Sequence, residues 1–274
     1  MVTKNIQGID VPEIGLGTYK LIGKECEQTV KLALNLGYRH IDTAQEYKNE
    51  REIGEAIKHA HIPREELFLT TKISLLNMEA DDVIKSTERS LQDLDVPYLD
   101  LLLIHWPNPD VDIEQTIEAM LSIRDQGKAL NIGVSNFPMK HLKEVNDELA
   151  APIFCNQVEY HANLGQFDLL DYAAENDLMV TAYSPLGQGK ILEEQLIKEL
   201  AQKYQKSPAQ IALRWLIEQE QVVVIPKASS RAHLEENMDI YDFVLDDDDF
   251  YAIDELPKDQ RIVTPDFAPD WEAV

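Results

Sequence analysis

The sequence has little cysteine and no long hydrophobic run. Its two cysteines, Cys26 and Cys155, lie far apart and away from other residues at metal-ligand spacing, so neither a disulfide framework nor a metal site is expected. No apolar run approaches membrane-spanning length, and the first ten residues, "MVTKNIQGID", lack the apolar core of a signal peptide. We therefore expect a cytoplasmic protein that has no membrane partner.

Positive charge is also scarce. The chain carries 25 basic residues against 50 acidic ones, which gives a formal net charge of −25. A surface of this sign repels duplex nucleic acid and anionic membranes at long range, so nucleic-acid binding is not expected. Self-association at low salt is disfavoured for the same reason.

Short apolar runs alternate with longer stretches of helical period along the whole chain. No linker or break in composition divides the sequence, so residues 1–274 are predicted to form a single domain. Eight strands that alternate with helices favour a (β/α)8 TIM barrel over a doubly wound sheet, which usually has five or six strands. The predicted strands are 14–19, 39–44, 67–73, 99–106, 130–136, 154–160, 179–186 and 222–227.

Additional elements are predicted at both ends of this pattern. Residues 5–15 resemble a hairpin with Gly8 near its turn, placed to cover the barrel floor. Two extra helices are expected, one within 191–205 and one within 245–257.

Several residues are of types that commonly begin or end helices. Ser207 before Pro208 is typical of a helix start, and Gly37 and Gly127 are typical of helix ends. The second helix is predicted to begin with a capping box formed by Asn49 and Glu52.

Polar residues stand at the carboxyl ends of the predicted strands, where such barrels build their active sites. Each has an ordinary structural explanation, such as an ion pair or a helix cap. Together they predict a site at one mouth. They are Asp42, Lys72, His105, Ser135, Asn136, Gln157, Tyr183, Ser184 and Lys227, with Tyr47 in the loop after the second strand.

Asp42, Tyr47, Lys72 and His105 restrict the chemistry of this mouth. There is no Ser-His-Asp order and no histidine pair at metal spacing, so hydrolysis by a nucleophile or zinc has little support. A Schiff base on Lys72 would make the protein an aldolase. Alternatively, a lysine held by Asp42 would lower the pKa of Tyr47 from about 10 toward neutrality. His105 would then donate to a carbonyl oxygen during reduction.

The motifs resemble those of the aldo-keto reductase superfamily over nearly the whole chain. "GYRHIDTAQEYKNEREIGEAI" matches the long family signature, and "LTTKI", "LDLLLIHWP", "IGVSNF", "NQVEYH", "TAYSPLGQGK" and "IPKASS" follow in the family's order. The ending is similar to that of prokaryotic 2,5-diketo-D-gluconate and methylglyoxal reductases. The resemblance implies a monomer in which Asp42, Tyr47, Lys72 and His105 are catalytic. Tyr47 would be the general acid in NAD(P)H-dependent reduction of small aldehydes and ketones.

The resemblance also implies where a dinucleotide would bind. Ser135, Asn136 and Gln157 would hold the nicotinamide carboxamide, and Tyr183 would stack on the ring. The loop 184–190 would cover the pyrophosphate. Ala228 and His233 replace a serine and an arginine of NADPH-selective members, so NADPH is favoured but NADH stays an alternative. The other predicted cofactor contacts are Gly17, Thr18, Ser184, Leu186, Gly187, Lys227, Ser229, Arg231, Glu236 and Asn237.

Substrate contacts are predicted for Tyr19, Ile73, Trp106 and Trp271, together with Phe267 in the tail. Barrel packing and anchoring of the tail are the alternatives for these side chains. The superfamily also includes channel-associated members, so a cofactor-binding, redox-sensing regulatory subunit is the alternative function.

Overall fold

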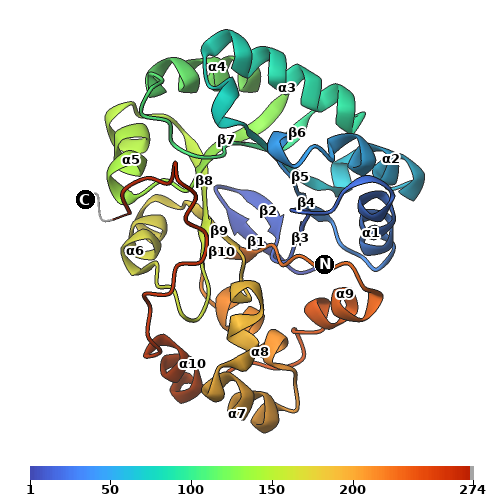
Figure 1. Ribbon diagram of the computed structural model, residues 1–274, viewed down its shortest axis with the longest axis vertical. Coiled ribbons are helices and arrows are strands. Elements are labelled where there is room, and N and C mark those ends of the chain that lie inside the picture. Colours follow the sequence, from blue (N-terminus) through green and yellow to red (C-terminus); the bar gives the residue numbers. More distant parts are fainter. Residues whose placement is uncertain (272–274) are drawn as a thin grey trace.

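Eight parallel strands follow one another in chain order around a curled sheet, in the computed structural model that describes residues 1–271 (Figure 1). The predicted alternation of strands and helices is confirmed as a TIM-like α/β fold. The strands are β3 (Leu16–Gly17), β4 (His40–Asp42), β5 (Phe68–Ile73), β6 (Leu99–Ile104), β7 (Ala129–Ser135), β8 (Ile153–Glu159), β9 (Met179–Tyr183) and β10 (Val222–Val224).

The first and last strands of this sheet approach each other through their flanking residues. The Gly15 N–H donates to the Val224 carbonyl at 2.8 Å, and the Val224 N–H donates to the Glu13 carbonyl at 2.9 Å. A Cβ atom on Gly17 would lie 2.6 Å from the Ile225 carbonyl oxygen, so the approach requires glycine there.

Helices surround the sheet on its outer side (Figure 1). Those that follow a strand are α1 (Gly23–Asn35), α2 (Glu50–Ala60), α3 (Ala80–Leu94), α4 (Ile113–Asp125), α5 (Met139–Lys143), α6 (Phe167–Asn176), α8 (Pro208–Ile217) and α9 (Arg231–Met238). The two extra helices are also present, as α7 (Gln195–Tyr204) and α10 (Asp247–Asp254).

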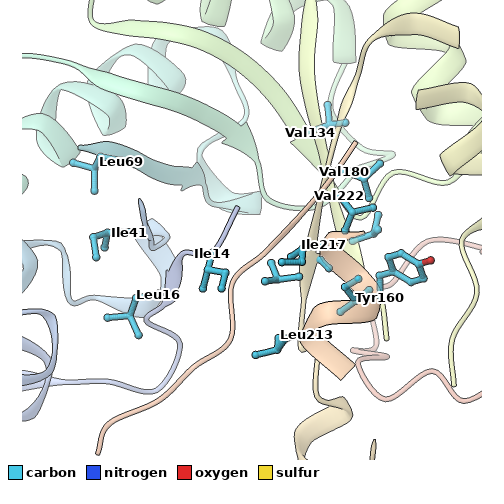
Figure 2. Packing of buried hydrophobic residues seen from close by; sticks show 14 of the residues in the cluster. Ile14, Leu16, Ile41, Leu69, Val134, Tyr160, Val180, Leu213, Ile217 and Val222 are labelled. Carbon is cyan, nitrogen blue, oxygen red and sulfur yellow. The ribbon is translucent and has the colours of Figure 1, made fainter. Parts of the chain in front are cut away.

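The period-two alternation of strand side chains separates two hydrophobic clusters. In β6, Leu102 and Ile104 pack in the outer cluster between strands and helices, whereas Leu101 and Leu103 pack in the inner cluster. Figure 2 shows part of the outer cluster, in which Leu213 of α8 contributes from the helical layer. Both faces of the strands are therefore buried, as in other parallel sheets.

The amino-terminal hairpin fills one end of the strand ring. Strands β1 (Thr3–Ile6) and β2 (Ile9–Pro12) pair antiparallel around a two-residue turn. Both turn residues have positive φ, 50° at Gln7 and 80° at Gly8, as a type I′ turn requires. Ile6 and Val11 are buried in the inner cluster with Phe68, which begins β5. The hairpin therefore covers the floor formed by the strands' amino ends, as predicted.

The helix-end predictions are confirmed at three positions. The Ser207 hydroxyl accepts from the Gln210 N–H, and the Gln210 side chain accepts from the Ser207 N–H, so α8 begins with a capping box. Gly37 and Gly127 follow the ends of α1 and α4 with φ of 103° and 71°.

Seven of the eight predicted strands were too long at the carboxyl end, by one to three residues. The run 14–19 contributes only Leu16–Gly17, and the run 179–186 ends at Tyr183. Ser184 has a φ of 48°, which an extended strand does not adopt. The chain therefore leaves the sheet earlier than its apolar pattern indicates, and the remaining residues form loops at the mouth.

Replacing Ile6 with alanine tests the role of the hairpin. Ile6 is 1% exposed, so Ile6→Ala should lower the free energy of unfolding by about 2–5 kcal/mol. The measurement is urea denaturation followed by circular dichroism. Val2→Ala is the control, because Val2 is 44% exposed and should change stability by less than about 0.5 kcal/mol. Equal stability of the two variants would contradict the packing of the hairpin in the core.

Candidate active site

A cleft of about 890 Å³ opens at the carboxyl ends of the strands. Its wall is formed by loops that follow the strands and by the chain after α10. The predicted site residues that line it are Gly17, Thr18, Tyr19, Asp42, Tyr47, His105, Trp106, Ser135, Asn136, Gln157, Tyr183, Ser184, Leu186, Lys227 and Phe267.

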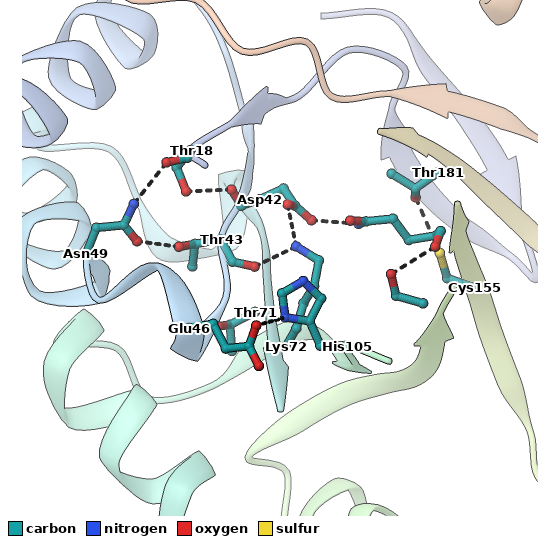
Figure 3. Close-up of polar contacts among 12 residues, drawn as sticks. Thr18, Asp42, Thr43, Glu46, Asn49, Thr71, Lys72, His105, Cys155 and Thr181 are labelled. Carbon is teal, nitrogen blue, oxygen red and sulfur yellow. Dashed lines mark hydrogen bonds and ion pairs between the residues drawn. The ribbon is translucent and has the colours of Figure 1, made fainter. Parts of the chain in front are cut away.

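A buried ion pair lies at the base of the cleft. The Lys72 ammonium donates to Asp42 Oδ1 at 2.6 Å and to the Thr43 carbonyl at 2.7 Å (Figure 3). Asp42 Oδ2 accepts from Gln157 Nε2 at 2.7 Å. Asp42 pairs in register with Thr70, and Lys72 shares a face of β5 with Thr70, so the sheet itself brings the two charges together. Burial lowers the pKa of Lys72, and Asp42 opposes that shift.

Tyr47 lies over this pair on a 3₁₀ turn, Gln45–Tyr47. The Lys72 Nζ atom is 5.2 Å from the centre of the Tyr47 ring. The pKa of Tyr47 is raised well above its ordinary value, first by burial and then by the charge of Asp42. The prediction that Lys72 lowers this pKa was therefore wrong for the free protein, because the ammonium is engaged by Asp42 and Thr43 while burial dominates.

His105 completes this end of the cleft. Its ring packs edge-on against Tyr47, with 5.6 Å between ring centres. Burial, followed by the charge of Lys72, lowers the pKa of His105 well below 6.5. The imidazole is therefore neutral at pH 7 and carries one N–H. Tyr47 and His105 thus present two uncharged donor side chains beside a buried cation.

Polar side chains on β7, β8 and β9 form a hydrogen-bonded group next to these residues. The Tyr183 hydroxyl donates to Asn136 Oδ1 at 2.7 Å, and Asn136 Nδ2 donates to the His105 carbonyl at 3.0 Å. The Ser135 hydroxyl donates to the Gln157 carbonyl at 2.9 Å. Tyr183 lines the cleft together with Ser135, Asn136 and Gln157, which carry hydroxyl and amide groups. This donor and acceptor set suits a planar carboxamide-bearing ring.

Comparison with known proteins gives the same assignment as the motifs. The model of the aldo/keto reductase family matches residues 13–258. The chain belongs to the aldo/keto reductase family. It is 41% identical over 256 residues to glyoxal reductase of Bacillus subtilis (strain 168), covering 93% of this chain and 92% of that protein. It is 38% identical over 266 residues to methylglyoxal reductase DkgB of Escherichia coli O157:H7, covering 96% and 99%.

Solved structures agree with this membership of the aldo/keto reductase family. A protein assigned provisionally as 2,5-diketo-D-gluconic acid reductase B superposes with a TM-score of 0.96 at 40% identity, covering 100% of this chain and 98% of that chain. An aldo-keto reductase from a Medee basin deep-sea metagenome library gives a TM-score of 0.92 at 37% identity, covering 97% and 99%.

Some predicted site residues of this aldo/keto reductase lie outside the cleft lining. Ile73 is fully buried and packs in the outer cluster, which corrects its predicted substrate contact. Trp271 instead packs on Trp106, with 6.1 Å between ring centres, and so reaches the cleft only through that neighbour. Predicted cofactor residues that do not contribute to the lining are Gly187, Ser229, Arg231, Glu236 and Asn237.

The tail contributes more to the site of this reductase than the motifs indicated. Ile262, Val263, Thr264 and Pro265 line the cleft beside the predicted Phe267. Their backbone is held by the fully buried carboxylate of Glu159, which accepts from the Ile262 N–H at 2.9 Å and from the Val263 N–H at 2.8 Å. Glu159 is the last residue of β8. This position at the carboxyl end of a strand could have identified it as a residue near the site.

Glu46 is a further cleft residue that the motifs did not predict. Its Oε1 atom accepts from the Ser74 hydroxyl at 3.0 Å. Its Oε2 atom is 3.5 Å from His105 Nδ1 (Figure 3). The available signal was its position directly before Tyr47, since one tight turn carries both side chains to the mouth.

Asn49 has a different role from the one predicted. Its side chain makes no cap for α2. Instead the buried amide donates to the carbonyls of Thr18 and Leu21 at 3.0 and 2.9 Å, and accepts from the Thr43 hydroxyl at 2.6 Å (Figure 3). Hydrogen bonds to residues distant in sequence thus take the place of the local helix cap. Through them Asn49 connects the loop after β3 to the loop after β4.

Asn49→Ala should lower the free energy of unfolding by about 2–4 kcal/mol, because two buried carbonyls would lose their donor. Glu52→Ala, the other half of the predicted capping box, should cost less than about 0.5 kcal/mol. Thermal and urea denaturation of both variants measure the difference. A larger effect at Glu52 than at Asn49 would restore the capping-box interpretation.

Proposed function

We propose that this protein reduces small aldehydes and ketones to alcohols with a reduced nicotinamide dinucleotide, and that Tyr47 is the general acid. The observation that carries the proposal is the buried Lys72–Asp42 pair beneath Tyr47 and His105 at one end of a long cleft. Carbonyl reduction needs a proton donor beside a stabilised developing oxyanion, and these residues form such a group. The names of the relatives suggest glyoxal, methylglyoxal and diketogluconate as the first substrates to assay.

The cleft residues fit a nicotinamide dinucleotide. Ser135, Asn136 and Gln157 would hold the carboxamide, and the Tyr183 ring would stack on the nicotinamide. When bound, the reduced ring supplies a hydride to the carbonyl carbon. Gly189 lines the cleft and has open space where a Cβ would project, so its backbone is accessible to a pyrophosphate.

NADPH is the favoured cofactor, because Lys227 and Arg231 offer cations to its 2′-phosphate. Lys227 is exposed and lines the cleft wall, where it suits a 2′-phosphate. Arg231 is close in sequence, but its guanidinium is paired with Glu235 at 2.8 Å. That exposed pair is weak, so a phosphate can compete for Arg231. NADH is the alternative, because Ala228 and His233 stand where NADPH-selective members have a serine and an arginine.

The protein's own groups would then act on the carbonyl oxygen. Tyr47 holds its proton through neutral pH, since its pKa is raised, and releases it as negative charge develops on the substrate oxygen. Neutral His105 donates one N–H to the same oxygen. A positioned general acid contributes about 10²–10⁴-fold to such a rate, and one oxyanion donor contributes about 10²–10³-fold.

The Schiff-base alternative lacks geometric support. Lys72 is fully buried, and its ammonium is bonded to Asp42 and to the Thr43 carbonyl. An amine that forms a Schiff base must reach the substrate carbon as a neutral nucleophile. Lys72 instead acts from behind Tyr47.

We also infer that the chain folds as one domain and that the curled sheet is a closed barrel. The bonds between the segments around Glu13, Gly15 and Val224 support closure, as does the inner cluster shared by β5, β6, β8, β9 and β10.

Tyr47→Phe should lower kcat by at least about 100-fold, because the ring and its packing stay while the acidic proton is lost. The dissociation constants of NADPH and NADH should stay within about threefold of wild type. Absorbance of the reduced nicotinamide follows methylglyoxal reduction, and fluorescence titration follows binding. Tyr251→Phe, an exposed position on α10, is the control.

Full turnover by Tyr47→Phe would remove Tyr47 from its role as acid. Tight cofactor binding by the wild type, without oxidation across a panel of aldehydes and ketones, would favour the regulatory redox sensor instead. The same titrations rank NADPH against NADH.

A further inference from the structure

Glu46 places a carboxylate at the reacting end of the cleft. About 35% of its side chain is exposed, and it lines the cavity next to Tyr47 and His105. Its Oε2 atom lies 3.5 Å from His105 Nδ1, and its Oε1 atom accepts from the Ser74 hydroxyl at 3.0 Å. The carboxylate is therefore held by Ser74 in a position beside His105.

The other charges that line the cleft within residues 1–271 do not cancel Glu46. Asp42 is already neutralised by Lys72 at 2.6 Å. Lys20 lies at the exposed rim, with its ammonium 5.2 Å from the Tyr19 ring centre, and Lys227 follows β10 at the end assigned to the adenosine phosphate. The imidazole beside Glu46 is uncharged. Among the described residues that line the cleft, Glu46 is therefore an acidic side chain that no cation of the lining neutralises.

The negative charge of Glu46 influences the pKa values of Tyr47 and Lys72. Glu46 contributes to the raised pKa of Tyr47, and it opposes the lowering of the Lys72 pKa by burial. These contributions are smaller than those of burial and of Asp42, and they show that the Glu46 carboxylate lies close enough to Tyr47 and Lys72 to act on a charge in the cleft. Two like charges held about 6 Å apart, at an effective dielectric constant of about 20, repel enough to change an equilibrium tenfold or more.

We propose that Glu46 is a specificity-determining residue, which makes the site select uncharged or cationic carbonyl compounds against those with a carboxylate close to the carbonyl. This inference rests on the proposed function and narrows its substrate class. Neutral dicarbonyls such as glyoxal and methylglyoxal fit the site, whereas a keto group next to a carboxylate, such as the 2-keto group of diketogluconate, is disfavoured. An anion long enough to reach Lys20 at the rim should be rejected less.

A matched pair of aldehydes tests the inference. Succinic semialdehyde carries a carboxylate two carbons from the carbonyl, and methyl 4-oxobutanoate presents the same aldehyde without the charge. We expect the wild type to prefer the ester at least tenfold in kcat/KM. In Glu46→Gln this preference should shrink about tenfold, mainly through a lower KM for the acid. Added salt should reduce the wild-type preference, because it screens the repulsion.

The control is Glu55→Gln, which removes the same charge from an exposed position on α2 and should leave the preference unchanged. An unchanged preference in Glu46→Gln would overturn the inference. Equal losses for both aldehydes would also overturn it, because Glu46 would then act through His105 and not on the substrate charge. If the wild type reduces neither aldehyde nor methylglyoxal with NADPH or NADH, the proposed function itself fails.

Discussion

The buried ion pair between Lys72 and Asp42 is the interaction on which the rest of the site depends. Removing two charges from water is costly, and the cost is recovered only when every charge is well bonded. Here the ammonium has Asp42 and the Thr43 carbonyl, and the carboxylate also has Gln157. Losing one partner of such a pair typically costs about 3–5 kcal/mol, so the surrounding loops are constrained to keep this geometry. Tyr47 and His105 are positioned against it, and both have strongly shifted pKa values as a result of the same burial.

The two ends of the strand ring serve different purposes. At the amino ends, the hairpin seals the interior with Ile6 and Val11 against an apolar cluster. At the carboxyl ends, the interior positions become polar, and Asp42, Lys72 and Gln157 replace aliphatic side chains. The amino end of the strand ring therefore contributes a packed apolar core, and the carboxyl end contributes the charged residues at the base of the cleft. The tail, held by Glu159, closes part of the mouth above that base.

The elements and the meeting of Asp42 with Lys72 were predictable because both follow from the period of the strands and from parallel neighbours in register. The helix start at Ser207 was predictable because Ser207 directly precedes Pro208, a local signal. The predictions that were wrong or missing concern contacts between residues that are distant in sequence. Asn49 has the sequence spacing of a helix cap, yet its side-chain amide donates to the carbonyls of Thr18 and Leu21. The direction of the Tyr47 pKa shift depends on how completely the folded chain buries the phenol. The role of Glu46 depends on the three-dimensional position of His105, which comes from another strand.

The central claim is that Tyr47, kept protonated above the buried pair, delivers the proton to a carbonyl being reduced. The most direct measurement is the pH dependence of the single-turnover rate of reduced nicotinamide oxidation by methylglyoxal, recorded by stopped flow for wild type and Tyr47→Phe. Because the reaction needs the protonated phenol, the wild-type rate should be constant through neutral pH and fall on the alkaline side, where Tyr47 ionises. That alkaline decrease should be absent from the residual rate of Tyr47→Phe. A rate that rises with pH, or the same alkaline decrease in both proteins, would contradict the account.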